Sequence, residues 1–505
     1  MACGGFLSAY FSFLAVPIVI AIVIFAGACI FIFEKPWIGV LLVGFFLPFE
    51  RIGGIDLIGQ TTIRISQVLA LVTIVSFVLF SLFIKKENRI NPNPILWPLL
   101  AFIAICAISL INAENLSRAL AVFLFTLFVI VFTLVIPKVV TKTSYVKKIV
   151  IVLMLSAVLV SLFGLYQFAG DVVGLPETLT GLRSHYTKEI FGFPRVHSTE
   201  TEPLYFANYL LIPIAIGAML FLEGKSHKVK KKNAKNGLKN FFQGSFFLIG
   251  TVVLCIIALG LTLSRGGYLG LATTAIMIFV LGFRRIFKVK NVAVLFILII
   301  LVVLIIVGFL NYSGKFSVDI FTEQATTYKE GVGVTERYDA YREAWRLFWR
   351  HPILGIGIGN FGPEIAAYPN KMPETGWKIV NNEPLELLAE TGIFGFVAIL
   401  GMVIILIVAS IRAMKALNRQ EAKDVDSERI YLRAVLSGFL AAFVGILVQY
   451  QTFSTLYVMH VWFVIGMLAA LLQISTSFYR GIGHRTRDTA ATNYKYRVSN
   501  KSCAL

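Results

Sequence analysis

Residues 312–391 read YSGKFSVDIFTEQATTYKEGVGVTERYDAYREAWRLFWRHPILGIGIGNFGPEIAAYPNKMPETGWKIVNNEPLELLAET, the longest polar stretch in the chain. This stretch holds eleven Asp and Glu residues against eight Lys and Arg residues, a net charge of −3, whereas the whole chain has a formal charge of +19. Short loops rich in Lys and Arg stay in the cytoplasm, whereas long loops can cross a membrane regardless of charge. Because apolar runs flank this stretch on both sides, we expect it to form one large extracytoplasmic loop.

The composition is that of a membrane protein. Hydrophobic residues make up 57% of the chain and charged residues only 14%, whereas soluble chains average about 25% charged residues. Apolar runs close to the ~20 residues that span a bilayer recur along the sequence. They lie at 11–33, 36–50, 65–84, 94–112, 119–137, 149–169, 204–222, 244–263, 267–283, 291–311, 393–411, 431–450 and 453–475. The sequence therefore predicts an all-α polytopic membrane protein with about 12–13 transmembrane helices.

The basic residues of the connecting segments fall on one side if each run crosses the membrane once. They are Lys85, Lys86, Arg89, Lys138, Lys142, Lys147, Lys148, the seven lysines of 225–239, Arg284, Arg285, Lys288, Lys290, Arg412, Lys415, Arg419 and those of the C-terminal tail. This side is predicted to be cytoplasmic. The chain then divides into N-terminal transmembrane helices (1–311), the extracytoplasmic loop (312–391), C-terminal transmembrane helices (392–478) and a cytoplasmic basic tail (479–505).

The charge and the cysteines exclude two other classes of function. A charge of +19 can indicate a nucleic-acid partner, but the basic residues here occupy short loops, as the positive-inside rule requires. We therefore expect membrane lipids and not nucleic acid as partners. The five cysteines show no spacing typical of metal ligands, so neither a metal nor a cofactor is predicted.

The first candidate site is Leu263–Tyr268 (LSRGGY), which separates two apolar runs. An arginine at the mouth of a helix pair needs an anionic partner or water, and its guanidinium forms a rigid donor fork suited to phosphate. The glycines after Arg265 allow a tight turn and a close approach by a ligand. The alternative is an arginine that snorkels to the interface at a helix end.

The second candidate site is the segment before the run at 204–222. It places Arg195, His197, Glu200 and Glu202 just above a membrane helix, on the side of Arg265, and Asn208 one turn into that helix. Ionisable residues so close to hydrocarbon indicate a functional site. The alternatives are that the two glutamates start the helix and that the histidine is structural.

The third candidate site is the large loop. Thr335–Arg350 has helical periodicity, with an aromatic stripe beside an arginine stripe, as expected of a helix on the membrane surface. The stripes are Tyr338, Tyr341, Trp345 and Phe348, and Arg342, Arg346 and Arg350. The alternating Gly355, Gly357 and Gly359 lack the strand and lysine of a phosphate-binding loop, so they are expected to mark close backbone approach instead.

These features occur in an order that resembles the O-antigen ligase/polymerase superfamily of membrane glycosyltransferases. The matching pieces are Ser264-Arg265-Gly266, Arg337 upstream of His351–Phe361, and Asn382–Leu385 leading to Leu388–Gly392. One departure concerns the end of the loop. Ligases typically carry a His-Asn pair where this chain has Asn381-Asn382, so the histidine proposed as their base or acceptor contact is absent.

The resemblance implies transfer or polymerisation of a polyprenyl-diphosphate-linked glycan at the outer face of the cell membrane, without a metal. The acceptor would be a glycan, a lipid or a protein. Arg265 and Arg195 would neutralise the leaving diphosphate, and a carboxylate or histidine would deprotonate the acceptor hydroxyl.

The candidates for that base are Glu383, Glu200, Glu202 and His197, and Glu383 could instead merely start the next helix. The predicted catalytic residues are Arg265, Arg195 and Glu383. The predicted substrate-binding residues are Arg337, His197, Glu202, Asn208, Asn381 and Asn382. The alternative function is a transporter or a flippase for lipid-linked glycans, which would be expected to carry ionisable residues near mid-bilayer.

Overall fold

A computed structural model of the chain describes residues 26–52, 55–57, 61–83, 93–187, 192–226, 244–286, 332–373, 376–419 and 427–477. Helices dominate these residues, and the strands among them form a single antiparallel hairpin, β1 (Ile55–Leu57) with β2 (Thr61–Ile63). Eight of the described helices are long and apolar enough to cross a membrane. The prediction of an all-α polytopic membrane fold is therefore confirmed.

The helices follow the predicted apolar runs closely. In chain order they are α2 (Trp37–Phe46), α3 (Ile65–Phe83), α4 (Leu96–Ser109), α5 (Leu116–Val139), α6 (Thr143–Val172), α7 (Glu177–Thr180), α8 (Pro203–Ser226), α10 (Ser245–Leu261), α11 (Arg265–Ile286), α14 (Val332–Arg350), α15 (Phe361–Glu364), α16 (Glu383–Arg419), α17 (Ser427–Gln449) and the helix Met459–Ser477. The run 291–311, most of 11–33, residues 312–331 and the tail 479–505 lie outside the described residues. The total of 12–13 helices therefore stays a prediction.

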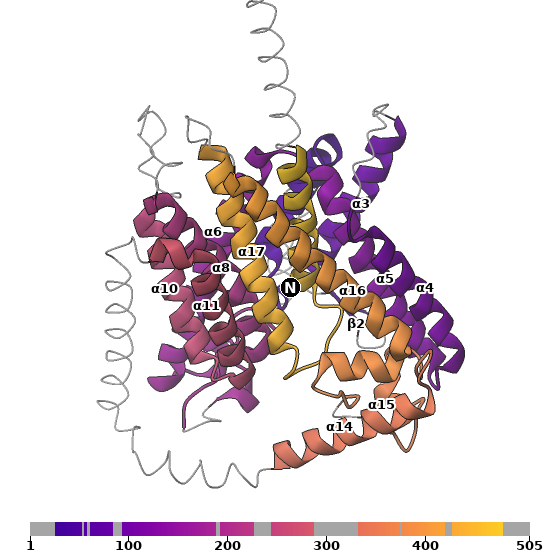
Figure 1. Cartoon of the computed structure of the whole chain (residues 1–505). Coiled ribbons are helices and arrows are strands. Elements are labelled where there is room, and N and C mark those ends of the chain that lie inside the picture. Colours follow the sequence, from indigo (N-terminus) through magenta and orange to yellow (C-terminus); the bar gives the residue numbers. More distant parts are fainter. Residues whose placement is uncertain are drawn as a thin grey trace, which may run out of the picture.

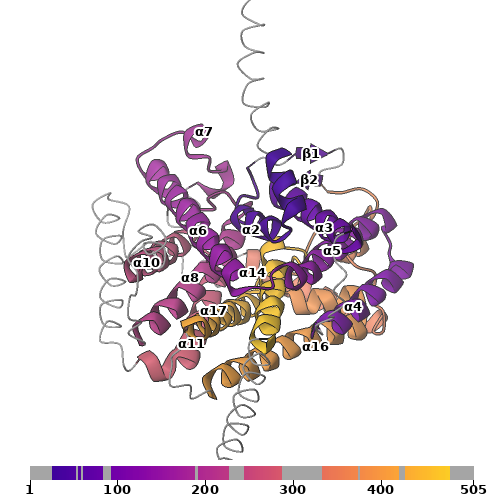
Figure 2. The ribbon, with the colours of Figure 1, turned by 90° about the horizontal axis from the view of Figure 1, so that it is seen from above.

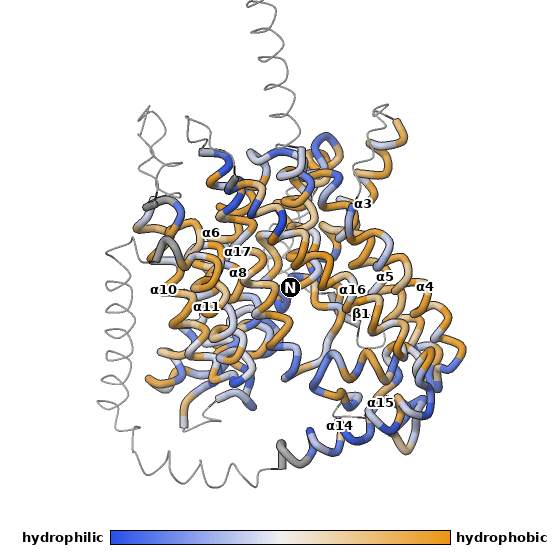
Figure 3. The backbone as a smooth tube through the Cα atoms, viewed as in Figure 1, coloured by the Kyte–Doolittle hydropathy of each residue, from blue (hydrophilic) through white to orange (hydrophobic). Residues whose placement is uncertain are grey.

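Helix α5 illustrates how the sequence produces a span. Asn115 precedes it, and the Asn115 side chain accepts a hydrogen bond from the Arg118 backbone N–H (3.0 Å), which satisfies a donor that a helix start otherwise leaves unpaired. The helix has 24 residues and is therefore about 36 Å long at ~1.5 Å per residue. This length exceeds the ~30 Å hydrocarbon core of a bilayer. The bundle as a whole is also suited to a bilayer, because hydrophobic residues fill its middle and hydrophilic residues gather at both ends (Figure 3).

Three helices form the centre of the bundle. The most apolar stretch is 78% buried in Pro203–Glu223, 72% in Ser427–Gln449 and 89% in Met459–Ser477, against 22% in Glu383–Asn418. Helix α8 packs against α10, α11 and α17, α4 packs against α16, and α2 packs against α3 and α6 (Figures 1 and 2). Polar groups on α8 and on the last helix are therefore withdrawn from lipid, whereas α16 is among the helices whose outer faces meet it.

The described part of the large loop forms a small layer at one end of the bundle, where α14 and α15 lie beside the start of α16 (Figure 1). Helix α16 is bent at Gly392, which has φ +65° and ψ −169°. A Cβ atom there would lie 2.3 Å from the Ile353 carbonyl oxygen, and one at Gly355 would lie 2.3 Å from the backbone of Glu390. Both positions therefore require glycine, because the loop and the helix touch backbone to backbone.

The alternating glycines hold an internal carboxylate. The backbone N–H groups of Gly359 and Phe361 donate to the two oxygens of Glu390 at 2.7 and 3.0 Å. The same loop is fixed to the first turn of α5, where Arg118 Nε donates to the Gly359 carbonyl oxygen at 2.6 Å. The prediction that these glycines mark close backbone approach is confirmed by the contact between Gly355 and the backbone of Glu390. The N–H groups of the loop bind the Glu390 carboxyl group and not a phosphate.

Replacement of Glu390 should therefore destabilise the loop. Glu390→Ala removes the acceptor of two buried N–H groups, and each buried donor left without a partner costs about 1–3 kcal/mol. We expect an apparent Tm lower by several degrees in detergent, measured by thermal unfolding. Glu336→Gln, an exposed position on α14, is the matched control and should leave the Tm unchanged. Equal Tm values for the two variants would show that the carboxylate does not hold the loop.

Candidate functional site

Three arginines from separate parts of the sequence meet at the end of the bundle that carries α14. Val196 donates its backbone N–H to the Leu261 carbonyl oxygen (3.1 Å), and Arg195 Nε lies 3.5 Å from the Thr262 carbonyl oxygen. This pairing sets Arg195 beside the start of α11, where Arg265 is exposed. Arg337, near the start of α14, is the third, and the charges of Arg195 and Arg337 both act on Arg265. The structure thus brings together Arg195, Arg265 and Arg337, as an anionic ligand would require.

The residues around Arg265 serve the helix start. The Ser264 hydroxyl oxygen accepts a hydrogen bond from the Gly267 N–H (3.2 Å), so Ser264 caps α11. A Cβ atom at Gly266 would lie 2.1 Å from Thr452 Oγ1, and one at Gly267 would lie 2.6 Å from Ala207 Cβ. These two glycines therefore allow close packing against Thr452 and Ala207, and not the approach of a ligand that the sequence suggested. Arg265 itself lies at the positive end of the helix dipole, where anions are favoured.

The segment before α8 adds further charge. Glu202 is exposed and lies near Arg183 and Arg195. His197, in contrast, is fully buried, and Arg51 Nη1 lies 3.1 Å from its Nε2. Burial, followed by the charges of Arg51 and Arg183, lowers the pKa of His197 to about 4. The imidazole is therefore neutral near pH 7 and faces protein groups, which suits a structural part better than the predicted contact with substrate.

Asn208 belongs to a buried network in the centre of the bundle. Its Oδ1 lies 2.7 Å from His460 Nε2, and its Nδ2 donates to Gln449 Oε1 at 3.0 Å. Gln449 Nε2 donates in turn to the Leu204 carbonyl oxygen at 3.2 Å. These hydrogen bonds tie α8, α17 and the last helix together inside the bundle. The structure therefore places Asn208 in the buried interior and not at the surface of the site.

The two asparagines predicted to bind substrate, Asn381 and Asn382, have structural roles at the start of α16. Asn382 Oδ1 accepts a hydrogen bond from the Leu385 N–H (3.1 Å), so Asn382 caps the helix. Asn381 has φ +59°, a conformation that Asn tolerates better than most residues, and its N–H donates to Ser454 Oγ at 3.0 Å. Both asparagines therefore shape the turn that presents Glu383.

The three carboxylates at the start of α16 differ in their partners. Glu390 is bound by the glycine loop, and Glu386 accepts hydrogen bonds from the Val380 N–H (2.8 Å) and from the Ser454 hydroxyl. Glu383 is buried, and its Oε2 has no hydrogen-bond partner among the described residues. Burial of an unpaired carboxyl oxygen is unfavourable. Of the three, Glu383 is thus the one with a buried oxygen that has no partner among the described residues.

The turn 450–456 joins the two halves of the site. The Glu383 N–H donates to the Tyr450 carbonyl oxygen (2.9 Å), and Thr452 contacts Gly266 on the arginine side. Tyr205 Oη lies 2.9 Å from Thr455 Oγ1, which fixes the turn to α8. Sequence reasoning missed this turn and His460. Their signal was the set of polar residues between and within the last two apolar runs, where ionisable or amide groups are expensive.

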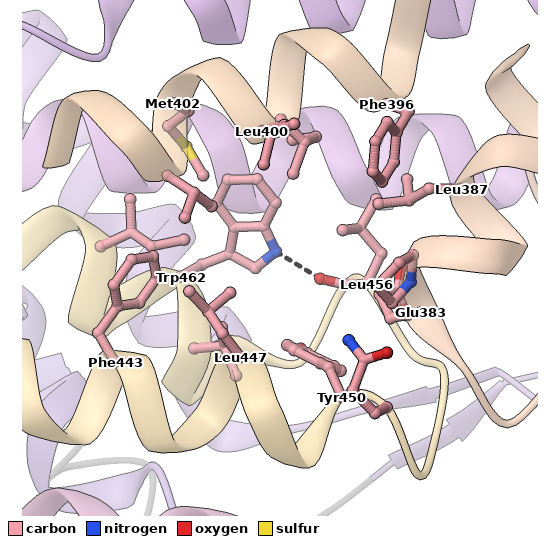
Figure 4. A pocket seen from close by; sticks show the side chains of 16 residues that line it. Glu383, Leu387, Phe396, Leu400, Met402, Phe443, Leu447, Tyr450, Leu456 and Trp462 are labelled. Atoms are coloured by element: carbon pink, nitrogen blue, oxygen red, sulfur yellow. Dashed lines mark hydrogen bonds between the residues drawn. The ribbon is translucent and has the colours of Figure 1, made fainter. Parts of the chain in front are cut away.

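An apolar cavity of about 230 Å³ extends from Glu383 between α16, α17 and the last helix. Figure 4 shows Glu383 and Tyr450 at one end and Met402 and Phe443 at the other, with Trp462 between them. Trp462 donates its Nε1–H to the Leu456 carbonyl oxygen at 2.6 Å, so its only polar atom is satisfied. Phe396, Leu400 and Leu447 complete the lining used below. The cavity therefore suits hydrocarbon, with its polar groups gathered beside Glu383.

Helix α14 keeps only part of the predicted stripe pattern. Arg342, Arg346 and Arg350 are exposed as expected, and Arg346 pairs with Glu343 on the same helix. The buried face consists of Ala344, Leu347 and Phe348, which pack with residues of the loop, whereas the predicted stripe members Tyr338 and Trp345 are 68% and 48% exposed. Helix α14 thus exposes aromatic and arginine side chains, and its location at the lipid headgroups stays a prediction.

The apolar bundle defines a polytopic membrane protein that gathers three arginines at one of its ends. The sequence model of the O-antigen ligase family matches residues 250–400, which include α11, α14 and the start of α16. This match covers part of the chain and supports the resemblance to the O-antigen ligase/polymerase superfamily that the sequence motifs indicate. None of the curated proteins compared with the chain matches it.

Proposed function

We propose that the protein is a membrane glycosyltransferase that transfers or polymerises a polyprenyl-diphosphate-linked glycan on the outer face of the cytoplasmic membrane. The observation that supports this most strongly is the convergence of Arg195, Arg265 and Arg337 beside the start of α11. Cations that lie close together repel one another, so this arrangement favours a ligand with more than one negative charge. A diphosphate at the lipid boundary has this property.

The proposed reaction needs little beyond these groups. The acceptor hydroxyl oxygen attacks the anomeric carbon of the donor glycan, a new carbon–oxygen bond forms, and the bond from that carbon to the diphosphate oxygen breaks. Arg265 and Arg195 stabilise the charge that develops on the diphosphate, and Arg337 adds to them from the loop. The hydroxyl proton passes to a base, for which the candidate is Glu383, whose buried Oε2 has no hydrogen-bond partner among the described residues.

A direct assay tests the function. We expect the purified protein in liposomes to convert a lipid-linked diphosphate glycan and a glycan or lipid acceptor into transferred glycan and free lipid diphosphate. The chelator EDTA should leave the rate unchanged, because arginines supply the positive charge. Failure of every acceptor class, with a folded protein, would overturn the proposed function.

The apolar cavity next to Glu383 is proposed to hold part of the lipid chain of a substrate. Its volume of about 230 Å³ exceeds the roughly 150 Å³ of a cavity that admits benzene, so a short piece of chain fits. We expect Leu447→Trp to raise the KM for a long-chain lipid-linked donor about tenfold, which corresponds to the loss of roughly two buried CH₂ groups at ~0.8 kcal/mol each.

The matched control is Val397→Trp, which adds the same side chain to an exposed position of α16 outside the cavity. This variant should keep the wild-type KM, and both variants should act normally on a water-soluble short-chain diphosphate donor. An unchanged KM for Leu447→Trp would remove the cavity from the substrate-binding site.

The outer orientation of the site is tested by labelling. In a background without the five native cysteines, Lys371→Cys should react with a membrane-impermeant maleimide on intact cells, because Lys371 is an exposed residue of the loop. Asn233→Cys, in the lysine-rich segment that lies outside the described residues, should react only after the cells are opened. The reverse pattern would invert the topology.

A further inference from the structure

After Arg195, the residues from His197 to Glu200 turn into the interior of the bundle. Ser198 Oγ donates to the Val160 carbonyl oxygen (2.6 Å), and the Arg51 N–H donates to the Thr199 carbonyl oxygen (2.9 Å). Ser198 has φ +54°, a conformation that is uncommon for residues other than glycine. These contacts bring the Glu200 side chain into the interior, where it is 0% exposed.

A second carboxyl group faces Glu200 there. Glu50, which follows α2, is 6% exposed and forms an ion pair with Arg64, whose Nη1 lies 3.4 Å from Glu50 Oε1. Glu200 and Glu50 interact directly through their side chains. Neither oxygen of Glu200 has a hydrogen-bond donor among the described residues when both carboxyl groups are ionised. A proton on one of the two groups supplies that donor.

Other groups around the pair do not replace this proton. Tyr209 on α8 lies near Glu200, Tyr205 lies near Glu50, and the charge of Arg64 reaches His460 on the last helix. Arg64 Nε and His460 Nδ1 are also buried and have no hydrogen-bond partner among the described residues. Arg64 is thus the permanent charge near the pair, and one cation cannot balance two buried carboxylates.

We propose that Glu50 and Glu200 form a proton-binding site that holds one proton between their two carboxyl groups, with Arg64 balancing the remaining negative charge. The resulting neutral cluster positions the segment 195–203. Since this segment carries Arg195, the cluster acts as a positioning element for the arginines, and this last step rests on the proposed function. The proton-binding site itself does not.

The pH dependence follows from the burial of Glu200. Burial, followed by the charge of Glu50, raises the pKa of Glu200 well above its usual value, and Arg64 opposes this only in part. A carboxyl group with a raised pKa binds its proton more tightly in the folded protein than in the unfolded chain. Its contribution to stability therefore declines as the pH rises above the unfolded-state pKa, and is lost as the pH passes the folded-state pKa.

The test compares apparent Tm values of the purified protein in detergent between about pH 6 and about pH 10. The wild-type Tm should fall as the pH rises. The Tm of Glu200→Gln should fall less, because the amide cannot ionise and the Glu50–Arg64 ion pair stays intact. Glu336→Gln, exposed on α14, should follow the wild type. Parallel curves for the wild type and Glu200→Gln would overturn the proposal.

The charge balance gives a second, independent measurement. Near pH 7, Glu50→Gln and Glu200→Gln alone should each stay close to the wild-type Tm, because each retains one carboxylate for Arg64. The double variant leaves Arg64 without a counter-ion and should lose on the order of 5 °C. Adding Arg64→Gln should restore part of that loss.

A double variant as stable as the single ones would show that Arg64 is not balanced by this pair, and would overturn the proposal. Because these measurements need no activity, a wild-type protein inactive in the transfer assay would overturn the proposed function alone.

Discussion

Arg265→Ala is expected to abolish most glycan transfer while the protein still folds in the membrane. Arg265 is the member of the arginine group on which the charges of both Arg195 and Arg337 act, so it lies centrally among them. Loss of one donor to a developing negative charge typically lowers kcat about 10²–10³-fold. We expect a fall of that size in single-turnover transfer from a lipid-linked donor, with an unchanged apparent Tm, because the Arg265 side chain is exposed.

The conservative variant separates charge from geometry. Arg265→Lys keeps the positive charge but loses the planar donor fork that can bind two phosphate oxygens at once. Its activity should lie between those of the wild type and Arg265→Ala. Arg350→Ala, which removes an exposed arginine of α14 away from this group, is the control and should transfer normally. Wild-type transfer by Arg265→Ala would refute the diphosphate-binding role.

The second large effect is expected for Glu383→Gln. If Glu383 accepts the proton of the acceptor hydroxyl, an amide in its place cannot, and general-base catalysis typically contributes about 10²–10⁴-fold. We expect kcat to fall within that range while the affinity for the lipid-linked donor stays nearly unchanged, as measured by direct binding. Gln retains the size of the side chain, so the helix start and its packing against the Tyr450 turn should persist.

Glu386→Gln is the informative comparison, because Glu386 lies one helical turn away but already binds the Val380 N–H and the Ser454 hydroxyl. This variant should lower the apparent Tm more than it lowers kcat in the folded fraction, whereas Glu383→Gln should do the reverse. If Glu383 only starts α16, then Glu383→Gln will behave as wild type in a transfer assay with titrated acceptor.

Much of the fold was readable from the sequence because its cause is local. An apolar run of about 20 residues must become a helix in a bilayer, since every backbone polar group there needs an internal partner. The Ser264-Arg265-Gly266 motif and the helix at 335–350 carry local marks of the same kind, a charge between two spans and a helical period. Both features lie where the sequence placed them, at the start of α11 and in α14.

The roles within the candidate site could not be read in this way. Glu383, Glu386 and Glu390 look alike in sequence. Only the packing of α16 against the glycine loop and the Tyr450 turn shows which carboxylate has a buried oxygen without a partner among the described residues. Sequence reasoning likewise treated His197 and Asn208 as groups that face substrate. Their partners, Arg51 and His460, come from distant parts of the chain.

The sequence by itself thus determined the helical membrane bundle, its resemblance to the O-antigen ligase family and the arginine at the start of α11. The tertiary structure alone decided that Arg337 joins Arg195 and Arg265, that Glu390 fills the glycine loop, and that Glu50 meets Glu200. The physical reason is that hydropathy and helical period act between near neighbours in the chain. Contacts between distant segments depend instead on how helices pack, and close approach, burial and charge balance exist only once they have done so.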